Sequence, residues 1–114
     1  MKRKNLIAKK ELSIMKNNAT LINTARGHIV NLYDLYEALS KNKIAYAALD
    51  VTDPEPIKME HPILKLENLT IVPHIASATV ETRKKMSKMT VDNIIEGLNS
   101  TIPTYCVNSE NIQW

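Results

Sequence analysis

Arg26, Glu55 and His74 carry three side chains that together can handle a small carboxylic acid. An arginine offers a planar pair of N–H donors that matches a carboxylate. A histidine can donate a proton to a carbonyl oxygen while a hydride reaches the carbon, and a neighbouring glutamate would orient the ring and favour its charged form. The three roles together describe reduction of a 2-oxo acid to a 2-hydroxy acid, for which a bound nicotinamide would have to supply the hydride.

Each of these residues, taken alone, has an ordinary structural explanation. An arginine after a strand is usually a solvated loop charge, and an acid between two prolines is common in exposed loops. His74 follows Pro73 and could equally be a surface histidine or a hydrogen-bonded core histidine. The other two histidines, His28 and His61, have no comparable placement, and we interpret them as structural. Only the combination of the three side chains supports the chemical interpretation.

Buried strands alternating with helices are expected to position these residues. The expected strands cover residues 19–23, 45–51 and 69–73, and the expected helices cover 8–17, 31–43 and 79–98. This alternation indicates an α/β fold with a parallel sheet, in which ligands gather outside the carboxyl ends of the strands. Arg26, Glu55 and His74 all follow a strand end, so we expect them at one rim of the sheet. Asp50, at the end of the second strand, joins them there.

The sequence also indicates how the helices begin and pack. Asn31 is the expected N-cap of the helix at 31–43, and Asp34 at its third position makes a variant of the capping box. The apolar residues on one face of this helix are Leu32, Leu35, Tyr36 and Leu39. Those on one face of the last helix are Val91, Ile94, Ile95 and Leu98. Three prolines make 52–68 a structured loop, and the tail after Pro103 is expected to be irregular.

Length and composition exclude several classes of protein. The 114 residues suffice for one domain with a core. A mild net charge of +3 and an aromatic fraction of 4% argue against nucleic-acid binding. No apolar run is long enough to span a membrane, the basic opening at 1–10 lacks the apolar core of a signal peptide, and no metal site is predicted. The lone Cys106 cannot form an internal disulfide, so a reducing compartment, the cytoplasm, is expected.

Four motifs make the chain similar to a known family. In order, they are "NTARG" (23–27), "ALDV" (48–51), "PEP" (54–56) and "PHIASAT" (73–79). With them, the chain from about Leu6 to Asn108 resembles the second half of the cofactor domain of the D-2-hydroxyacid dehydrogenases. The stretches "DLYEALSKNKIA" and "LDVTDPEP" are most similar to the glyoxylate/hydroxypyruvate reductase branch.

The resemblance implies roles for particular residues. Arg26 would bind the substrate carboxylate, His74 would donate the proton, and Glu55 would pair with that histidine. The residues implied at the nicotinamide end of NAD(P)H are Thr24 (through its backbone), Ala25, Asp50 and Ala76. Glycine often occupies the position of Ala76 in the reductase branch, and alanine still leaves room for the cofactor. The family commonly forms homodimers.

The sequence departs from the family in what it lacks. Its two glycines, Gly27 and Gly97, cannot make a GxGxxG phosphate loop, which normally holds the pyrophosphate at a helix N-terminus. We therefore expect residues 1–108 to be the C-terminal half of a doubly wound dinucleotide-binding domain, and 109–114 a tail. The first strand of such a half-sheet would have an open edge and its faces would be poorly covered. The chain alone is expected to have little activity.

Two alternatives to a reductase of glyoxylate or hydroxypyruvate remain open. The chain could be a non-catalytic piece, either a partial subunit that docks on a full-length homologue through its bare sheet edge or a remnant without function. It could also act on another D-2-hydroxy acid, because the same three side chains suit many such substrates. The sequence does not decide between NADH and NADPH, because the residues that read the ribose 2′ position belong to the other half of the domain.

Overall fold

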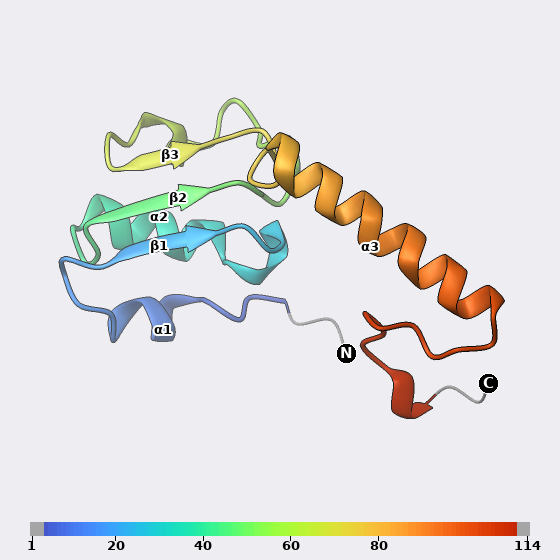
Figure 1. The fold of residues 1–114 in the computed structure, drawn as a ribbon. Coiled ribbons are helices and arrows are strands. Elements are labelled where there is room, and N and C mark those ends of the chain that lie inside the picture. Colours follow the sequence, from blue (N-terminus) through green and yellow to red (C-terminus); the bar gives the residue numbers. More distant parts are fainter. Residues whose placement is uncertain (1–3, 112–114) are drawn as a thin grey trace. The chain divides into compact units, whose positions relative to one another are not determined.

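Three short parallel strands form the centre of the fold. The computed structural model describes residues 4–111, which divide after Ala76 into two compact units. In the first unit the strands are β1 (Thr20–Asn23), β2 (Tyr46–Leu49) and β3 (Leu69–Ile71). They lie in the order β1-β2-β3 with both pairs parallel, as Figure 1 shows. The predicted α/β fold with a parallel sheet is confirmed, and each strand is shorter than predicted.

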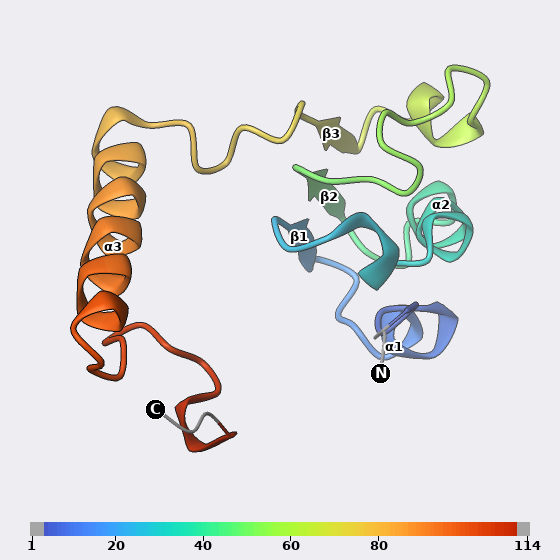
Figure 2. The same ribbon diagram turned by 90° about the vertical axis from the view of Figure 1, so that its right-hand side faces the viewer.

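One face of the sheet is packed against helices. The helices α1 (Lys9–Ser13) and α2 (Leu32–Ser40) lie on this side, as Figure 2 shows, together with the 3₁₀ turn η2 (Pro62–Lys65). The predicted apolar face of α2 points into this layer. The buried residues of the resulting core are Leu12, Val30, Leu35, Ala38, Leu39, Ile44, Ala47, Leu49 and Ile63. This packing fixes the sheet, and with it the loops that leave its carboxyl end.

The other face of the sheet is open, so the strands, which were expected to be buried, are buried on one side only. Because side chains alternate along a strand, Ile22, Ala48 and Thr70 share one register position on this face, and Ile22 is 67% exposed. The hydroxyl groups of Tyr46 and Thr70 are hydrogen-bonded across it at 2.8 Å. The open edge expected at β1 is present, whereas the expectation that both faces are poorly covered holds for one face only.

Asn31 caps α2 as predicted, but the capping box is not formed. The Asn31 side chain accepts hydrogen bonds from the N–H groups of Tyr33 and Asp34, both at 3.1 Å. The Asp34 carboxylate accepts instead from the N–H of Lys9 at 3.0 Å, at the start of α1. The Asn31 N–H, which a capping box would satisfy locally, donates to the carbonyl of Ile7 at 2.8 Å. A tertiary contact between α1 and α2 therefore replaces the local one.

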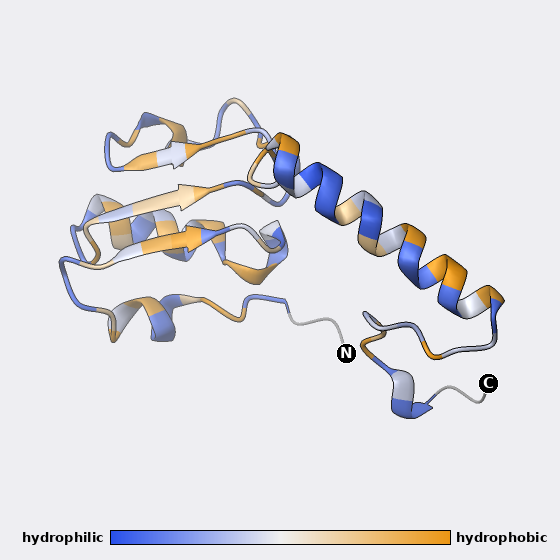
Figure 3. Ribbon diagram, in the orientation of Figure 1, coloured by the Kyte–Doolittle hydropathy of each residue, from blue (hydrophilic) through white to orange (hydrophobic). Residues whose placement is uncertain are grey.

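The second unit is a long helix followed by an irregular segment. The helix α3 (Val80–Leu98) begins at Thr79, whose side chain accepts from the N–H of Thr82 at 3.1 Å. Apolar and polar residues alternate along it, as Figure 3 shows, and none of its residues is buried. The predicted apolar face at Val91, Ile94, Ile95 and Leu98 is exposed.

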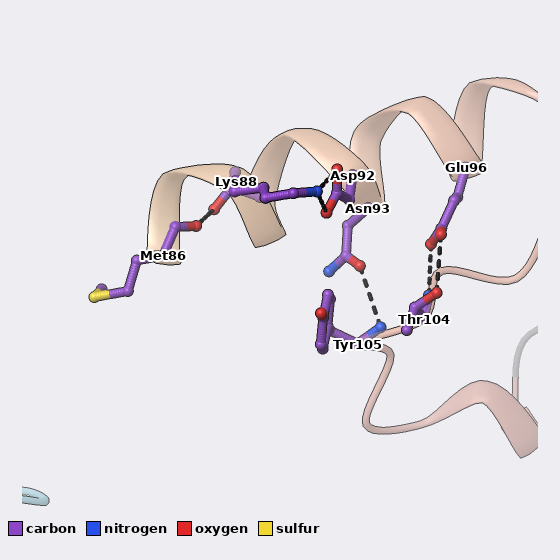
Figure 4. A network of polar contacts seen from close by, with 8 residues as sticks. Met86, Lys88, Asp92, Asn93, Glu96, Thr104 and Tyr105 are labelled. Atoms are coloured by element: carbon purple, nitrogen blue, oxygen red, sulfur yellow. Dashed lines mark hydrogen bonds and ion pairs between the residues drawn. The ribbon is translucent and has the colours of Figure 1, made fainter. Parts of the chain in front are cut away.

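The segment after α3 folds back onto the helix through hydrogen bonds, shown in Figure 4. The Glu96 carboxylate accepts from the N–H of Thr104 at 2.6 Å and from its hydroxyl at 2.8 Å. One turn earlier, Asp92 is paired with Lys88 at 2.7 Å, and this hydrogen bond raises the pKa of the Lys88 ammonium. The predicted irregular tail contains one 3₁₀ turn, η3 (Ser109–Asn111), and its last residues, 112–114, lie outside the described residues.

None of the helices within residues 4–111 combines the length and the apolar character needed to cross a membrane.

Candidate active site

The carboxyl end of the sheet carries the three residues singled out from the sequence. Arg26 lies three residues after β1, Glu55 lies in the loop that follows β2, and His74 lies three residues after β3. Parallel strands in neighbouring positions end on the same side of a sheet, so these three loops leave from one rim. All three belong to the first unit, which has its own core.

Glu55 and His74 are in direct contact. The imidazole Nδ1 lies 2.8 Å from a carboxylate oxygen of Glu55, which accepts its hydrogen bond. The Glu55 side chain is 44% exposed and the His74 side chain is 49% exposed, so a small molecule can reach both. With Nδ1 engaged by the carboxylate, Nε2 is the ring atom left to exchange a proton with a ligand. The Thr52 hydroxyl donates to the carbonyl of Pro54 at 2.9 Å and so steadies the chain before Glu55.

The backbone of His74 is held in an uncommon conformation. Its φ angle of 55° lies in the left-handed region, which costs free energy for a residue other than glycine. Its N–H donates to the carbonyls of Asp50 and Val72, at 3.1 and 3.0 Å. The next two N–H groups, of Ile75 and Ala76, both donate to Oδ1 of Asp50, at 2.6 and 3.0 Å. These four hydrogen bonds fix the direction in which the imidazole leaves the loop.

Asp50 therefore has a structural function in addition to any contact with a cofactor. The residue is only 5% exposed, and its Oδ1 atom is occupied by the two N–H groups of the His74 loop. The other oxygen, Oδ2, accepts no hydrogen bond from residues 4–111, so it can accept one from a ligand, such as the N–H of a carboxamide. Sequence reasoning placed Asp50 at the rim but did not anticipate that it anchors the histidine loop.

A hollow of about 370 Å³ opens beside the Glu55–His74 pair. Its volume lies within the range of about 300–1,000 Å³ that is usual for small-molecule pockets. Its lining residues are Asp50, Thr52, Glu55, Pro56, Ile57, Ile71, Val72, Pro73 and His74. Arg26 does not line it; its guanidinium donates from Nη1 to the carbonyl of Ala25 at 2.6 Å. The structure thus brings two of the three predicted catalytic residues together and leaves the third outside this hollow.

The loop that carries Arg26 is pinned against the loop that carries Glu55. A Cβ atom on Gly27 would lie 1.9 Å from the carbonyl oxygen of Thr52, far inside van der Waals contact. Only glycine permits this approach of the two backbones. The 3₁₀ turn η1 (Gly27–Ile29) starts at this contact, so the Arg26 loop is fixed on its C-terminal side.

The remaining residues predicted at the cofactor are small and accessible. Thr24, Ala25 and Ala76 are all exposed at the ends of their strands. Their small side chains leave space for a flat ring, and the unused oxygen of Asp50 offers a polar contact. The two glycines of the sequence, Gly27 and Gly97, do not provide a glycine-rich loop for the pyrophosphate.

Asn23, the last residue of β1, was missed by sequence reasoning. Its side chain is buried and hydrogen-bonded to the Arg26 loop. The available signal was an asparagine at the end of an apolar strand, since a polar residue that follows a buried segment needs a partner. His61, interpreted as structural, caps η2 by accepting from the N–H of Ile63 at 3.2 Å.

The sequence of this chain is similar to those of known dehydrogenases and reductases. A family model of the D-isomer specific 2-hydroxyacid dehydrogenase NAD-binding domain matches residues 1–76. The chain is 52% identical over 84 residues to the glyoxylate reductase/hydroxypyruvate reductase of Mus musculus, covering 74% of this chain and 26% of that protein. It is 44% identical over 108 residues to the glyoxylate reductase of Korarchaeum cryptofilum, covering 95% of this chain and 32% of that protein.

A solved structure agrees with these matches. The NADPH-dependent glyoxylate/hydroxypyruvate reductase of Sinorhizobium meliloti, in complex with NADP and malonate, superposes with a TM-score of 0.78 at 32% identity, covering 96% of this chain and 34% of that one. The chain thus spans about a third or less of the length of the proteins that it matches. Family model, relatives and structure agree, and the chain belongs to the D-isomer specific 2-hydroxyacid dehydrogenase family.

Proposed function

We propose that this chain supplies the catalytic, nicotinamide-side part of an NAD(P)H-dependent reductase of small 2-oxo acids. Glyoxylate and hydroxypyruvate are the proposed substrates, and the D-2-hydroxy acid is the product. The observation that carries the proposal is the 2.8 Å hydrogen bond between Glu55 and His74 beside a hollow of ligand size. The names of the matched relatives support the substrate class. The bound malonate of the Sinorhizobium protein supports recognition of a small carboxylate.

The proton in this reaction comes from His74. Glu55 accepts the Nδ1 hydrogen bond and keeps the ring in one orientation, so that a proton on Nε2 is delivered to the carbonyl oxygen of the substrate. Bound NAD(P)H would supply the hydride that reaches the carbonyl carbon. The oxo group becomes a hydroxyl group, and the ring regains its proton from water, which the exposure of the pair permits.

The substrate carboxylate is assigned to Arg26. Its side chain is exposed, and one guanidinium nitrogen is engaged with the carbonyl of Ala25, which leaves further N–H donors for a carboxylate. Binding at this position would orient the oxo group relative to His74. The free oxygen of Asp50 would meet the carboxamide of the cofactor, while its other oxygen keeps the histidine loop in place.

Kinetics of the native protein with glyoxylate and NADH or NADPH test this assignment. H74Q removes the proton donor and should lower kcat by about 10²- to 10⁴-fold. R26Q removes a charged hydrogen bond of about 1.5–3 kcal/mol and should raise KM by roughly 10- to 150-fold. The matched controls H28Q and E60Q, outside the hollow, should leave both constants unchanged. Wild-type kcat in H74Q would contradict the proposal.

Activity of the isolated 114-residue chain is expected to be low. A cofactor held only at its nicotinamide end lacks the backbone N–H groups that normally bind the pyrophosphate, so its binding should be weak. Homodimer formation and a cytoplasmic location stay predictions.

A further inference from the structure

The direction in which the Arg26 side chain projects from the rim depends on the position of its backbone. Its side chain is exposed, and the hydrogen bond that it makes goes to the neighbouring carbonyl of Ala25. A long side chain without further support samples many rotamers, and ordering it on binding costs free energy. A loop that holds the Arg26 backbone in one position removes part of that cost.

Asn23 holds this loop with both ends of its amide group. Its Oδ1 accepts from the N–H of Ala25 at 3.1 Å, and its Nδ2 donates to the carbonyl of Arg26 at 3.0 Å. Asparagine combines an acceptor and a donor on one planar group, whereas aspartate at the same position has no donor. The two bonds therefore fix the Thr24–Ala25 and Arg26–Gly27 peptide groups, which lie on either side of the Ala25–Arg26 pair.

Asn23 is itself held firmly. It is the last residue of β1, in register with Leu49, and is 6% exposed. Its own carbonyl accepts from the N–H of Asp50 at 2.9 Å, which continues the sheet ladder by one step. On the far side of the loop, Gly27 lies against Thr52. The turn between them is fixed at both ends.

We propose that Asn23 is a positioning residue that pre-organises Arg26 for the substrate carboxylate, an inference that rests on the proposed function. It acts through the Arg26 backbone and touches neither substrate nor cofactor. Asp50 does the same for the His74 loop, so two neighbouring strand ends each send one buried polar side chain into a loop of the rim.

The test is the effect of N23D on the kinetics of the native protein with glyoxylate. The substitution is nearly isosteric but replaces the donor to the Arg26 carbonyl by a carboxylate oxygen that repels it, so KM should rise by about 3- to 10-fold with kcat changed less than twofold. N23S, whose hydroxyl is too short to reach Arg26, should show the same selective rise. The matched control is N31D, because Asn31 uses only its acceptor oxygen and aspartate caps a helix equally well.

The outcomes separate the two proposals. If R26Q raises KM but both folded Asn23 variants keep the wild-type value, the positioning function is wrong and the proposed function stands. If R26Q has no effect on KM, the assignment of Arg26 fails, and this inference fails with it. Loss of the fold in both N23D and N23S, checked by circular dichroism, would make Asn23 purely structural and would also overturn the inference. A selective rise of KM in both variants, with N31D unchanged, supports it.

Discussion

Residues 4–76 and residues 77–111 are stabilised in different ways. The first unit buries Leu35, Leu39 and Ile63 between its sheet and helices, and its polar rim is braced by hydrogen bonds from buried side chains. The second unit has a helix without a single buried residue, held by its cap, a Lys88–Asp92 pair and a few bonds to the following segment. Every residue of the candidate site lies in the first unit. The contacts described for the site therefore come from the first unit.

The largest expected contrast is between two leucines, each on a helix. Leu35 of α2 is fully buried, so L35A should lower the free energy of unfolding by about 2–5 kcal/mol through lost burial and a cavity. Leu98 of α3 is 81% exposed, and L98A should change the free energy of unfolding by less than about 0.5 kcal/mol. Urea unfolding followed by circular dichroism measures both. Equal losses would show that the apolar face of α3 is packed as firmly as the core.

Replacing each of the two glycines with alanine should change the free energy of unfolding in opposite directions. G27A forces a Cβ against the Thr52 carbonyl, and the strain should cost about 1–3 kcal/mol. G97A lies inside α3, where alanine is a better helix former, and should stabilise the helix by about 0.5–1 kcal/mol. Thermal unfolding of the two variants provides the comparison. A neutral G27A would mean that the two rim loops are not in close contact.

The smallest expected contrast concerns the two helix caps. N31A removes the acceptor for two N–H groups of α2 and should cost about 1 kcal/mol of the stability of the first unit. T79A removes the corresponding cap of α3, and its effect should be confined to the helix content of the second unit. Amide hydrogen exchange resolves the two units residue by residue. Faster exchange in the β-strands of T79A would show that the units unfold together.

Much of the fold could be predicted because local signals and tertiary structure agree. The apolar runs marked all three strands, and Asn31 marked the start of α2. The capping box failed because Asp34 bonds a residue 25 positions away, at the start of α1. The open face of the sheet was expected from the missing half of the domain and not from the residues of the strands. Ile22 and Ala48 are apolar, so nothing in their chemistry distinguishes an exposed position from a buried one.

Some residues of the candidate site could likewise be predicted from the sequence, and others could not. Arg26, Glu55 and His74 could be placed at one rim from residue type and strand ends, because parallel strands end together. The two buried side chains that hold the rim loops, Asn23 and Asp50, could not be found in this way. They form hydrogen bonds with backbone N–H and carbonyl groups, which nearly every residue carries. The left-handed backbone of His74 also left no trace in the sequence, because glycine was not used there.

We propose that a 2-oxo acid binds at the carboxyl end of β1, β2 and β3. Titration of the isotope-labelled chain with glyoxylate, followed by nuclear magnetic resonance, tests it most directly. We expect chemical-shift changes at the Arg26 guanidinium, the His74 imidazole and the amides of Ile75 and Ala76, with none along α3. Changes centred on α3, or a His74 resonance that stays fixed while glyoxylate binds elsewhere, would contradict the account.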